Sequence, residues 1–106
     1  MIKESDSAVL QEFAGRVREL FPEARIWAYG SRARGDAEPD SDFDICIVVN
    51  NADREAERKV SKIAWEVSFS HEMVITTLCF SESEFYRGPD SVSPLVKNIL
   101  QEGVAA

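Results

Sequence analysis

The sequence predicts an α/β (α+β) fold in which helices pack on a small sheet. Two long segments, 6–21 and 53–69, carry apolar residues at helical spacing. Shorter runs rich in β-branched and aromatic residues lie between and after them. Helices and strands that alternate in this way are typical of layered folds. Because the 106 residues contain no linker, repeat or low-complexity tract, we expect a single domain over residues 1–106.

The first half of the chain is predicted to form one long helix and two strands. The helix over 6–21 ends at Pro22, and a short strand follows over 26–29. A helical turn over 31–34 and a polar loop then lead to a second strand over 43–49. Since this strand is almost continuously apolar and rich in β-branched residues, we expect it in the centre of the sheet.

The second half is predicted to add another long helix, a third strand and two shorter helices. Asp53 is a suitable N-cap for the helix over 53–69, and the third strand covers 73–80. The remaining elements are a short helix capped by Ser81 or Ser83 and a last helix over 95–101 that Gly103 ends.

Several large or sulfur-containing side chains are assigned to the interior by their positions. Trp65 and Phe69 lie four residues apart near the apolar stripe of the second long helix, so we expect them to pack against the sheet. Cys46 and Cys79 fall within apolar runs and are expected to be buried, reduced thiols. With a single histidine and no paired cysteine spacing, a zinc site is not expected.

The charge balance and hydropathy restrict the classes of partner. The formal net charge of −7 argues against duplex nucleic acid, because phosphate contacts need a basic face. It is compatible with a nucleotide whose charge a metal ion neutralises. No segment approaches the length of a membrane span, and the N-terminal residues lack the pattern of a signal peptide. We therefore expect a cytoplasmic protein without a membrane partner.

The most informative residues are a Gly-Ser turn and a pair of aspartates. Gly30 and Ser31 directly follow the first predicted strand, and Asp42 and Asp44 open the second. Alternate side chains of a strand face the same way, so the two carboxylates should project together while Phe43 is buried behind them. Neighbouring carboxylates repel each other unless a cation lies between them. Mg²⁺ prefers hard oxygen ligands together with water and phosphate.

The turn offers chemistry that complements the aspartates. Gly30 lets the backbone approach a phosphate without a Cβ, and the following amides and the Ser31 hydroxyl can donate to phosphate oxygens. Arg32 and Arg34 either add positive charge to the site or pair, as surface charges, with acids of the adjoining loop. The turn and the aspartates together predict a nucleotide site with metal-binding carboxylates.

A Gly-Ser turn followed, after a spacer, by Asp-x-Asp resembles the nucleotidyltransferase superfamily typified by DNA polymerase beta. The fuller motif, Gly-Ser-Arg-Ala-Arg-Gly over 30–35 with Ser-Asp-Phe-Asp over 41–44, is similar to that of the minimal nucleotidyltransferases. The resemblance implies a nucleotidyltransferase fold with a small mixed sheet flanked by helices, and an NTP, most simply ATP, as donor of a nucleoside monophosphate. It implies a nucleotide site made of Gly30, Ser31 and Arg34, and a catalytic pair that holds Mg²⁺, made of Asp42 and Asp44.

The third predicted strand departs from the superfamily pattern. Members normally carry a third carboxylate on the strand after the second long helix, where it helps to hold a second metal ion and activates the attacking hydroxyl. Here that strand contains no aspartate, and Thr76 or Thr77 takes the inward position. Glu72 is the nearest acid, at the strand entrance. We therefore expect weak or conditional catalysis.

Three functions are compatible with the sequence. The first is transfer of a nucleotide, by resemblance AMP, to a protein or small hydroxyl acceptor, as the antitoxin half of a pair with a small helical toxin of the HEPN class. The second is a catalytically weak or inactive partner protein that keeps the fold and acts by binding. The third is a nucleotide-sensing regulatory subunit of a larger enzyme. A homo-oligomer is also compatible with the sequence. One small domain can form only one side of an acceptor site, so a second copy of the chain could form the other.

Overall fold

The computed structural model describes residues 1–106. Its elements in chain order are α1 (Glu4–Leu20), β1 (Arg25–Tyr29), α2 (Gly30–Arg34), β2 (Phe43–Val49), α3 (Arg54–His71), β3 (Ile75–Ser81), α4 (Glu82–Tyr86), a 3₁₀ helix η1 (Pro89–Val92), α5 (Pro94–Glu102) and β4 (Val104–Ala105). The α/β fold class is confirmed, and the strand predicted over 43–49 has the same bounds as β2.

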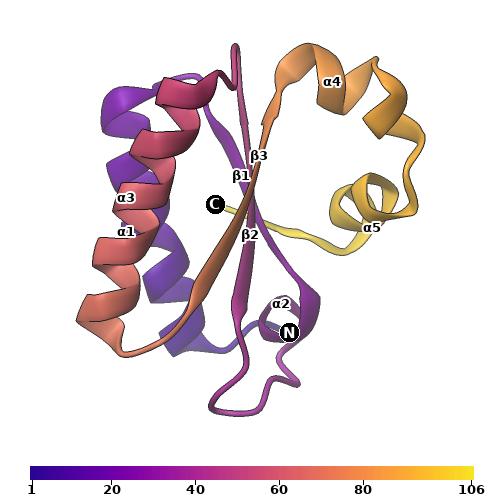
Figure 1. Ribbon diagram of the computed structural model, residues 1–106. Coiled ribbons are helices and arrows are strands. Elements are labelled where there is room, and N and C mark those ends of the chain that lie inside the picture. Colours follow the sequence, from indigo (N-terminus) through magenta and orange to yellow (C-terminus); the bar gives the residue numbers. More distant parts are fainter.

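The four strands form one mixed sheet in the order β3-β2-β1-β4. β2 is antiparallel to β1 and parallel to β3, and β4 is antiparallel to β1. Parallel neighbours need a crossover connection, which α3 supplies between β2 and β3. Figure 1 shows α1 and α3 on one face of the sheet and α4, η1 and α5 on the other. As expected, β2 lies inside the sheet rather than at an edge.

Each face of the sheet has its own apolar core. The core under α1 and α3 contains 18 buried residues, and β2 contributes every second side chain to it from Phe43 to Val49. The core under α4 and α5 contains six buried residues: Trp27, Cys46, Val48, Phe85, Val96 and Ile99. The alternation of β2 side chains between the two cores is the period-two pattern of a strand that is covered on both faces.

Helix caps follow from local sequence. The Asp53 side chain accepts a hydrogen bond of 2.8 Å from the Ala56 amide at the start of α3, as predicted. Ser81, not Ser83, caps α4, where Ser81 and Glu84 form a reciprocal capping box. The two residues of β4 were not expected, because so short a strand has no sequence pattern of its own and depends on pairing with Trp27 and Ala28 in β1.

The prediction for the aromatic side chains of α3 is wrong. Trp65 and Phe69 are 66% and 76% exposed and stack on each other with ring centroids 5.7 Å apart. The side of α3 that faces the sheet is filled by smaller buried side chains, such as Ala64 and Val67, and the two aromatic residues lie outside that stripe. Trp27, by contrast, is buried and stacks on Phe85.

The cysteines are free thiols, as expected, with Cys46 buried and Cys79 partly buried. Burial raises the pKa of Cys46 to about 12 and, with the nearby charges of Glu57 and Glu84, that of Cys79 to about 11. None of the helices combines the length and the apolar character that crossing a membrane requires.

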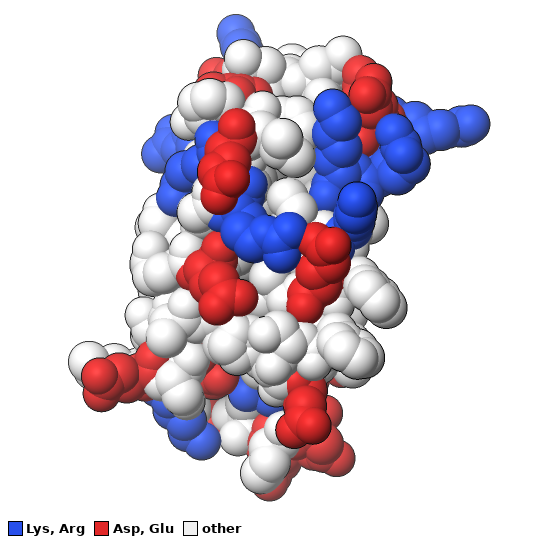
Figure 2. Space-filling model, turned by 90° about the vertical axis from the view of Figure 1, so that its left-hand side faces the viewer, with Lys and Arg blue, Asp and Glu red and all other residues white.

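The outer surface of α1 and α3 carries charges of both signs. Figure 2 shows Lys and Arg interleaved with Asp and Glu over this face. Arg16 of α1 pairs with Glu66 of α3, with 2.5 Å between Nη2 and Oε1. Lys59 and Glu55 form an i,i+4 pair along α3, with 3.3 Å between Nζ and Oε1. These exposed pairs therefore belong to a solvated face of mixed charge and do not form a basic stripe.

Candidate functional site

The Gly-Ser turn lies directly against the carboxylate of Asp44. Gly30 opens α2 with a φ of +77°, a conformation that glycine adopts without strain. A Cβ added at Gly30 would lie 2.8 Å from Oδ2 of Asp44. Glycine is therefore favoured here for two reasons, its backbone conformation and the approach of the turn to the acid. The spacing of the two motifs in the sequence corresponds to contact between them in space.

Asp44 is the second residue of β2 and faces Tyr29 of β1 and Thr76 of β3 in the strand register. The Thr76 hydroxyl donates a hydrogen bond of 2.5 Å to Oδ1 of Asp44. Asp42 lies just before β2 and is exposed to solvent, while Phe43 between the two acids is fully buried. Asp44 thus has one oxygen beside the Gly30 turn and the other bonded to β3.

The register decides which threonine faces the acids. Thr76 pairs with Asp44, whereas Thr77 pairs with Ile45, whose side chain belongs to the core under α1 and α3. Thr77 therefore lies on the opposite face of the sheet. Glu72 follows α3 as its C-cap in the left-handed conformation, with a φ of +53°, and is exposed before the strand begins. The position expected for a third acid holds a hydroxyl.

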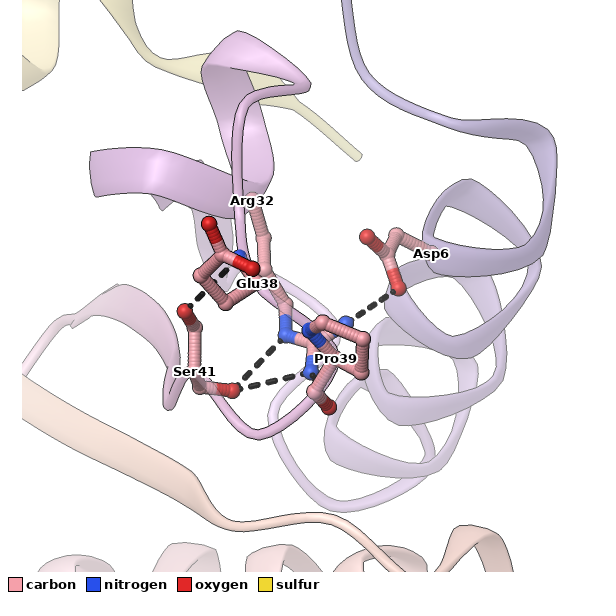
Figure 3. Close-up of polar contacts among 5 residues, drawn as sticks. All are labelled: Asp6, Arg32, Glu38, Pro39 and Ser41. Carbon is pink, nitrogen blue, oxygen red and sulfur yellow. Dashed lines mark hydrogen bonds and ion pairs between the residues drawn. The ribbon is translucent and has the colours of Figure 1, made fainter.

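Arg32 is held inside the protein and is not a surface charge. Its guanidinium forms an ion pair of 2.9 Å with Asp6 of α1 and donates to the carbonyl oxygens of Ser41 and Pro39, as Figure 3 shows. Arg32 is 8% exposed and Asp6 is 5% exposed. Neither expectation for Arg32, free positive charge at the site or pairing with the acids of the adjoining loop, is correct, because its partners are Asp6 and backbone oxygens.

Arg34 and Ser31 remain at the surface end of the turn. Arg34 is exposed, and its Nε lies 3.3 Å from Oδ2 of Asp36, so its guanidinium is accessible to a ligand. Its carbonyl oxygen accepts a hydrogen bond of 2.7 Å from the N-terminal ammonium of Met1. Ser31 is partly buried in the first turn of α2. Gly35 ends α2 with a φ of +84° and leaves no room for a Cβ beside Met1.

Tyr29 adds a neutral donor next to the acids. Burial, followed by the charge of Asp44 and the nearby Cys46, raises the pKa of Tyr29 to about 12. The phenol therefore stays protonated at neutral pH and cannot add negative charge beside Asp44.

Sequence reasoning missed the pairing of Asp6 with Arg32. The two residues are 26 positions apart, and Asp6 in the first turn of α1 has the pattern of an ordinary acid at a helix start. The one available signal was the position of Arg32 inside the Gly-Ser motif. That signal indicates a role near the turn but does not identify a partner.

The candidate site lies on open surface rather than in a cavity. A hollow of about 490 Å³ is lined by residues at the end of α3 and the start of β3, among them Trp65, Phe69 and Val74, and not by the two aspartates. The chemistry of its residues still defines a site, because a glycine turn can bind phosphate and neighbouring carboxylates can bind a cation without an enclosing pocket. No cluster of three or more His, Cys, Asp or Glu side chains forms a complete metal cage.

Two solved structures are similar to this chain in fold. A structure of a toxin–antitoxin with AMP-PNP is similar, with a TM-score of 0.64 and 16% identity over 90% of this chain and 69% of that one. A candidate nucleotidyltransferase from Sulfolobus solfataricus is similar with a TM-score of 0.59 and 24% identity, over 96% of this chain and 82% of that one. At these identities the likeness establishes the fold.

A search of curated proteins found no match. The model of the nucleotidyltransferase domain family matches residues 10–105, which include the Gly-Ser turn, both aspartates and all four strands. Since this match covers nearly the whole sequence, the chain belongs to the nucleotidyltransferase domain family.

Proposed function

We propose that this chain binds a nucleoside triphosphate together with Mg²⁺ and transfers the nucleoside monophosphate to a hydroxyl acceptor. The observation that carries the proposal is the contact between the Gly30 turn and the Asp44 carboxylate. A backbone turn that can hold phosphate and an acid that can hold a cation are thereby brought to one place. Membership in the nucleotidyltransferase domain family supports the same reaction.

Asp42 and Asp44 are the residues proposed to hold Mg²⁺. Their donor set fits the ion, because Mg²⁺ is commonly bound by one or two carboxylates, with water and substrate phosphates completing its shell. When bound, the ion would neutralise charge on the phosphates and on the departing pyrophosphate. The protonated Tyr29 beside Asp44 adds no competing negative charge.

The other residues of the proposed site bind and orient the triphosphate. Gly30 and Ser31 would donate from the turn to phosphate oxygens, and the exposed guanidinium of Arg34 would add a charged contact. In the reaction, the acceptor oxygen bonds to the α-phosphorus and the bond from that phosphorus to the β-phosphate oxygen breaks. Pyrophosphate leaves, and the acceptor proton passes to solvent.

The nucleotide and the acceptor are proposed from the fold likeness. The structural neighbour with AMP-PNP is a toxin–antitoxin protein, which favours an adenine nucleotide and a protein partner. We propose ATP as the donor and a small helical protein of the HEPN class as the partner, with this chain as the antitoxin, acting in the cytoplasm where ATP is available. The net charge of −7 favours such a partner over duplex nucleic acid.

A second function has specific support at Thr76. A hydroxyl bonded to Asp44 takes the place where the superfamily pattern has a third carboxylate. A site with two acids can bind a metal–nucleotide complex yet transfer slowly, so the chain would then act on its partner by binding. The two functions share the site and differ in turnover.

The decisive experiment is a calorimetric titration of the chain with ATP in Mg²⁺. The double substitution Asp42→Asn and Asp44→Asn should abolish Mg²⁺-dependent binding and leave the fold intact. The matched control is Glu38→Gln with Asp40→Asn, which removes the same charge from exposed positions of the adjoining loop. Unchanged affinity in the first double variant would refute the proposal.

A separate assay distinguishes transfer from binding alone. The chain is incubated with Mg²⁺ and ATP labelled at the α-phosphate, with and without the product of a neighbouring gene for a small helical protein. Covalent label on the partner supports the transferase. ATP binding without label, at any partner concentration, supports the second function.

A further inference from the structure

We propose that Arg32, together with Asp6, positions Asp42 relative to Asp44 and does not contact the nucleotide. The inference rests on the proposed function, because it assigns a task within the metal-binding pair. It separates the two arginines of the Gly-Ser motif, which the sequence alone presents as equivalent.

The guanidinium is bonded to the peptide group that carries Asp42. Arg32 donates from Nε and Nη2 to the Ser41 carbonyl oxygen, at 3.0 and 2.8 Å. That carbonyl belongs to the peptide bond between Ser41 and Asp42. Nη2 also donates to the Pro39 carbonyl oxygen at 3.1 Å (Figure 3). Because two nitrogens donate to the same carbonyl oxygen, both the position and the orientation of this peptide group are restrained.

The same guanidinium also contacts the residue between the two acids. Its Cζ lies 5.9 Å from the ring centroid of Phe43, which is fully buried. The Phe43 amide donates to the Val74 carbonyl oxygen at 2.8 Å, where pairing with β3 begins. Asp42 is therefore held by Arg32 on its N-terminal side and by the sheet on its C-terminal side, whereas Asp44 lies within the ladder itself.

The loop before Asp42 is a small unit that depends on Arg32. The Ser41 amide donates to the Glu38 carbonyl oxygen, and the Glu38 amide donates to the Ser41 hydroxyl, both at 3.0 Å. These two bonds close the loop on itself. The bonds from Arg32 to Pro39 and Ser41 then attach the closed loop to α2, and Asp6 attaches Arg32 to α1.

Burial excludes Arg32 from direct phosphate binding and makes it sensitive to substitution. Arg32 is 8% exposed, and its guanidinium is already bonded to three groups. Little of its surface is therefore left to contact a triphosphate. Loss of one partner of a buried ion pair leaves an uncompensated charge. Lysine keeps the positive charge but lacks the planar set of N–H donors of the guanidinium. Arg32→Lys therefore removes the positioning contacts selectively.

The test compares Arg32→Lys with Arg18→Lys. Arg18 also donates from Nε and Nη2 to backbone carbonyl oxygens, those of Ala24 and Ala106, but at the far end of α1. The readout is the Mg²⁺ concentration that gives half-maximal ATP binding, measured beside ATP affinity in saturating Mg²⁺. Residues that support metal ligands typically change metal affinity by roughly 10- to 100-fold.

We expect Arg32→Lys to raise the Mg²⁺ midpoint by about 10-fold or more, with ATP affinity in saturating Mg²⁺ nearly unchanged. Arg18→Lys should leave both quantities unchanged even if it lowers thermal stability. Asp6→Asn, which keeps an acceptor for Arg32, should shift the midpoint in the same direction by less, and provides the test if Arg32→Lys does not fold. Lower ATP affinity at saturating Mg²⁺ with an unshifted midpoint would show nucleotide contact and overturn the inference.

A second measurement does not depend on nucleotide binding. Amide hydrogen exchange over residues 36–42 should accelerate in Arg32→Lys and not in Arg18→Lys. Unchanged protection of this loop would contradict the positioning role. If the wild-type chain binds no ATP while exchange accelerates as expected, the proposed function fails and the positioning role stands.

Discussion

The two faces of the sheet differ in what the same strand provides to them. Toward α1 and α3, β2 presents Phe43, Ile45, Ile47 and Val49, all buried in the larger core. Toward α4 and α5, it presents Cys46 and Val48 to a smaller core, but Asp44 at its start is only partly covered. The period-two alternation thus lets one strand stabilise the fold on one side and carry reactive groups on the other.

The difference explains why polar chemistry is tolerated in a central strand. An isolated buried carboxylate is costly, so an acid in a central strand must lie where solvent or a partner reaches it. The helices of the second face cover the C-terminal half of β2, and Asp44 lies beyond them, next to Thr76 and the Gly30 turn. The first face has no such opening along the strand.

The largest effect is expected from truncation on the first face. Ile45→Ala should lower the free energy of unfolding by roughly 2–5 kcal/mol, because it removes fully buried methyl groups from the larger core. Asp44→Asn, one residue away on the other face, should change it by less than about 1 kcal/mol, since an amide oxygen can still accept from Thr76. Urea unfolding measures both, and similar losses would contradict the division between the faces.

The turn beside Asp44 is expected to be sensitive in both stability and ATP binding. Gly30→Ala places a Cβ against the carboxylate and keeps a positive φ, which should cost roughly 1–3 kcal/mol. It should also weaken Mg²⁺-dependent ATP binding, because either the turn or the Asp44 carboxylate must move to make room for the Cβ. Calorimetry and thermal unfolding of one preparation test both effects. Normal ATP affinity in this variant would show that the turn and the acid act separately.

A smaller and conditional effect is expected for Thr76→Asp. Without metal, two carboxylates at paired positions of neighbouring strands should destabilise the fold by up to about 1 kcal/mol. Mg²⁺ should reverse this loss and raise any transfer rate, because the new acid supplies the missing ligand. Thermal unfolding with and without Mg²⁺ is the measurement, with Thr77→Asp on the opposite face as control. A loss that Mg²⁺ does not reverse would place residue 76 outside the metal site.

The sequence predicted features that depend on local pattern, and missed features that depend on distant partners. The bounds of β2 and the cap at Asp53 follow from runs and spacing that neighbouring residues determine. The link between Asp6 and Arg32 joins different elements and leaves no local pattern. Trp65 was misassigned because helical spacing alone does not define the edge of the buried stripe of a helix. The packing of α3 on the sheet decides which residues belong to that stripe.

The smallest predicted effect tests whether the covering helices can be changed without touching the site. Gly15 lies inside α1, and a Cβ added there meets no atom within 4 Å. Because glycine within a helix is less stable than alanine, Gly15→Ala should raise the free energy of unfolding by roughly 0.5–1 kcal/mol. Its Mg²⁺ midpoint and ATP affinity should equal those of the wild type, since the ion pair of α1 with Arg32 is made by Asp6, nine residues earlier. Urea unfolding and calorimetry decide the outcome, and a changed Mg²⁺ midpoint would show that the stability of α1 as a whole, rather than the Asp6–Arg32 contact, controls the aspartate pair.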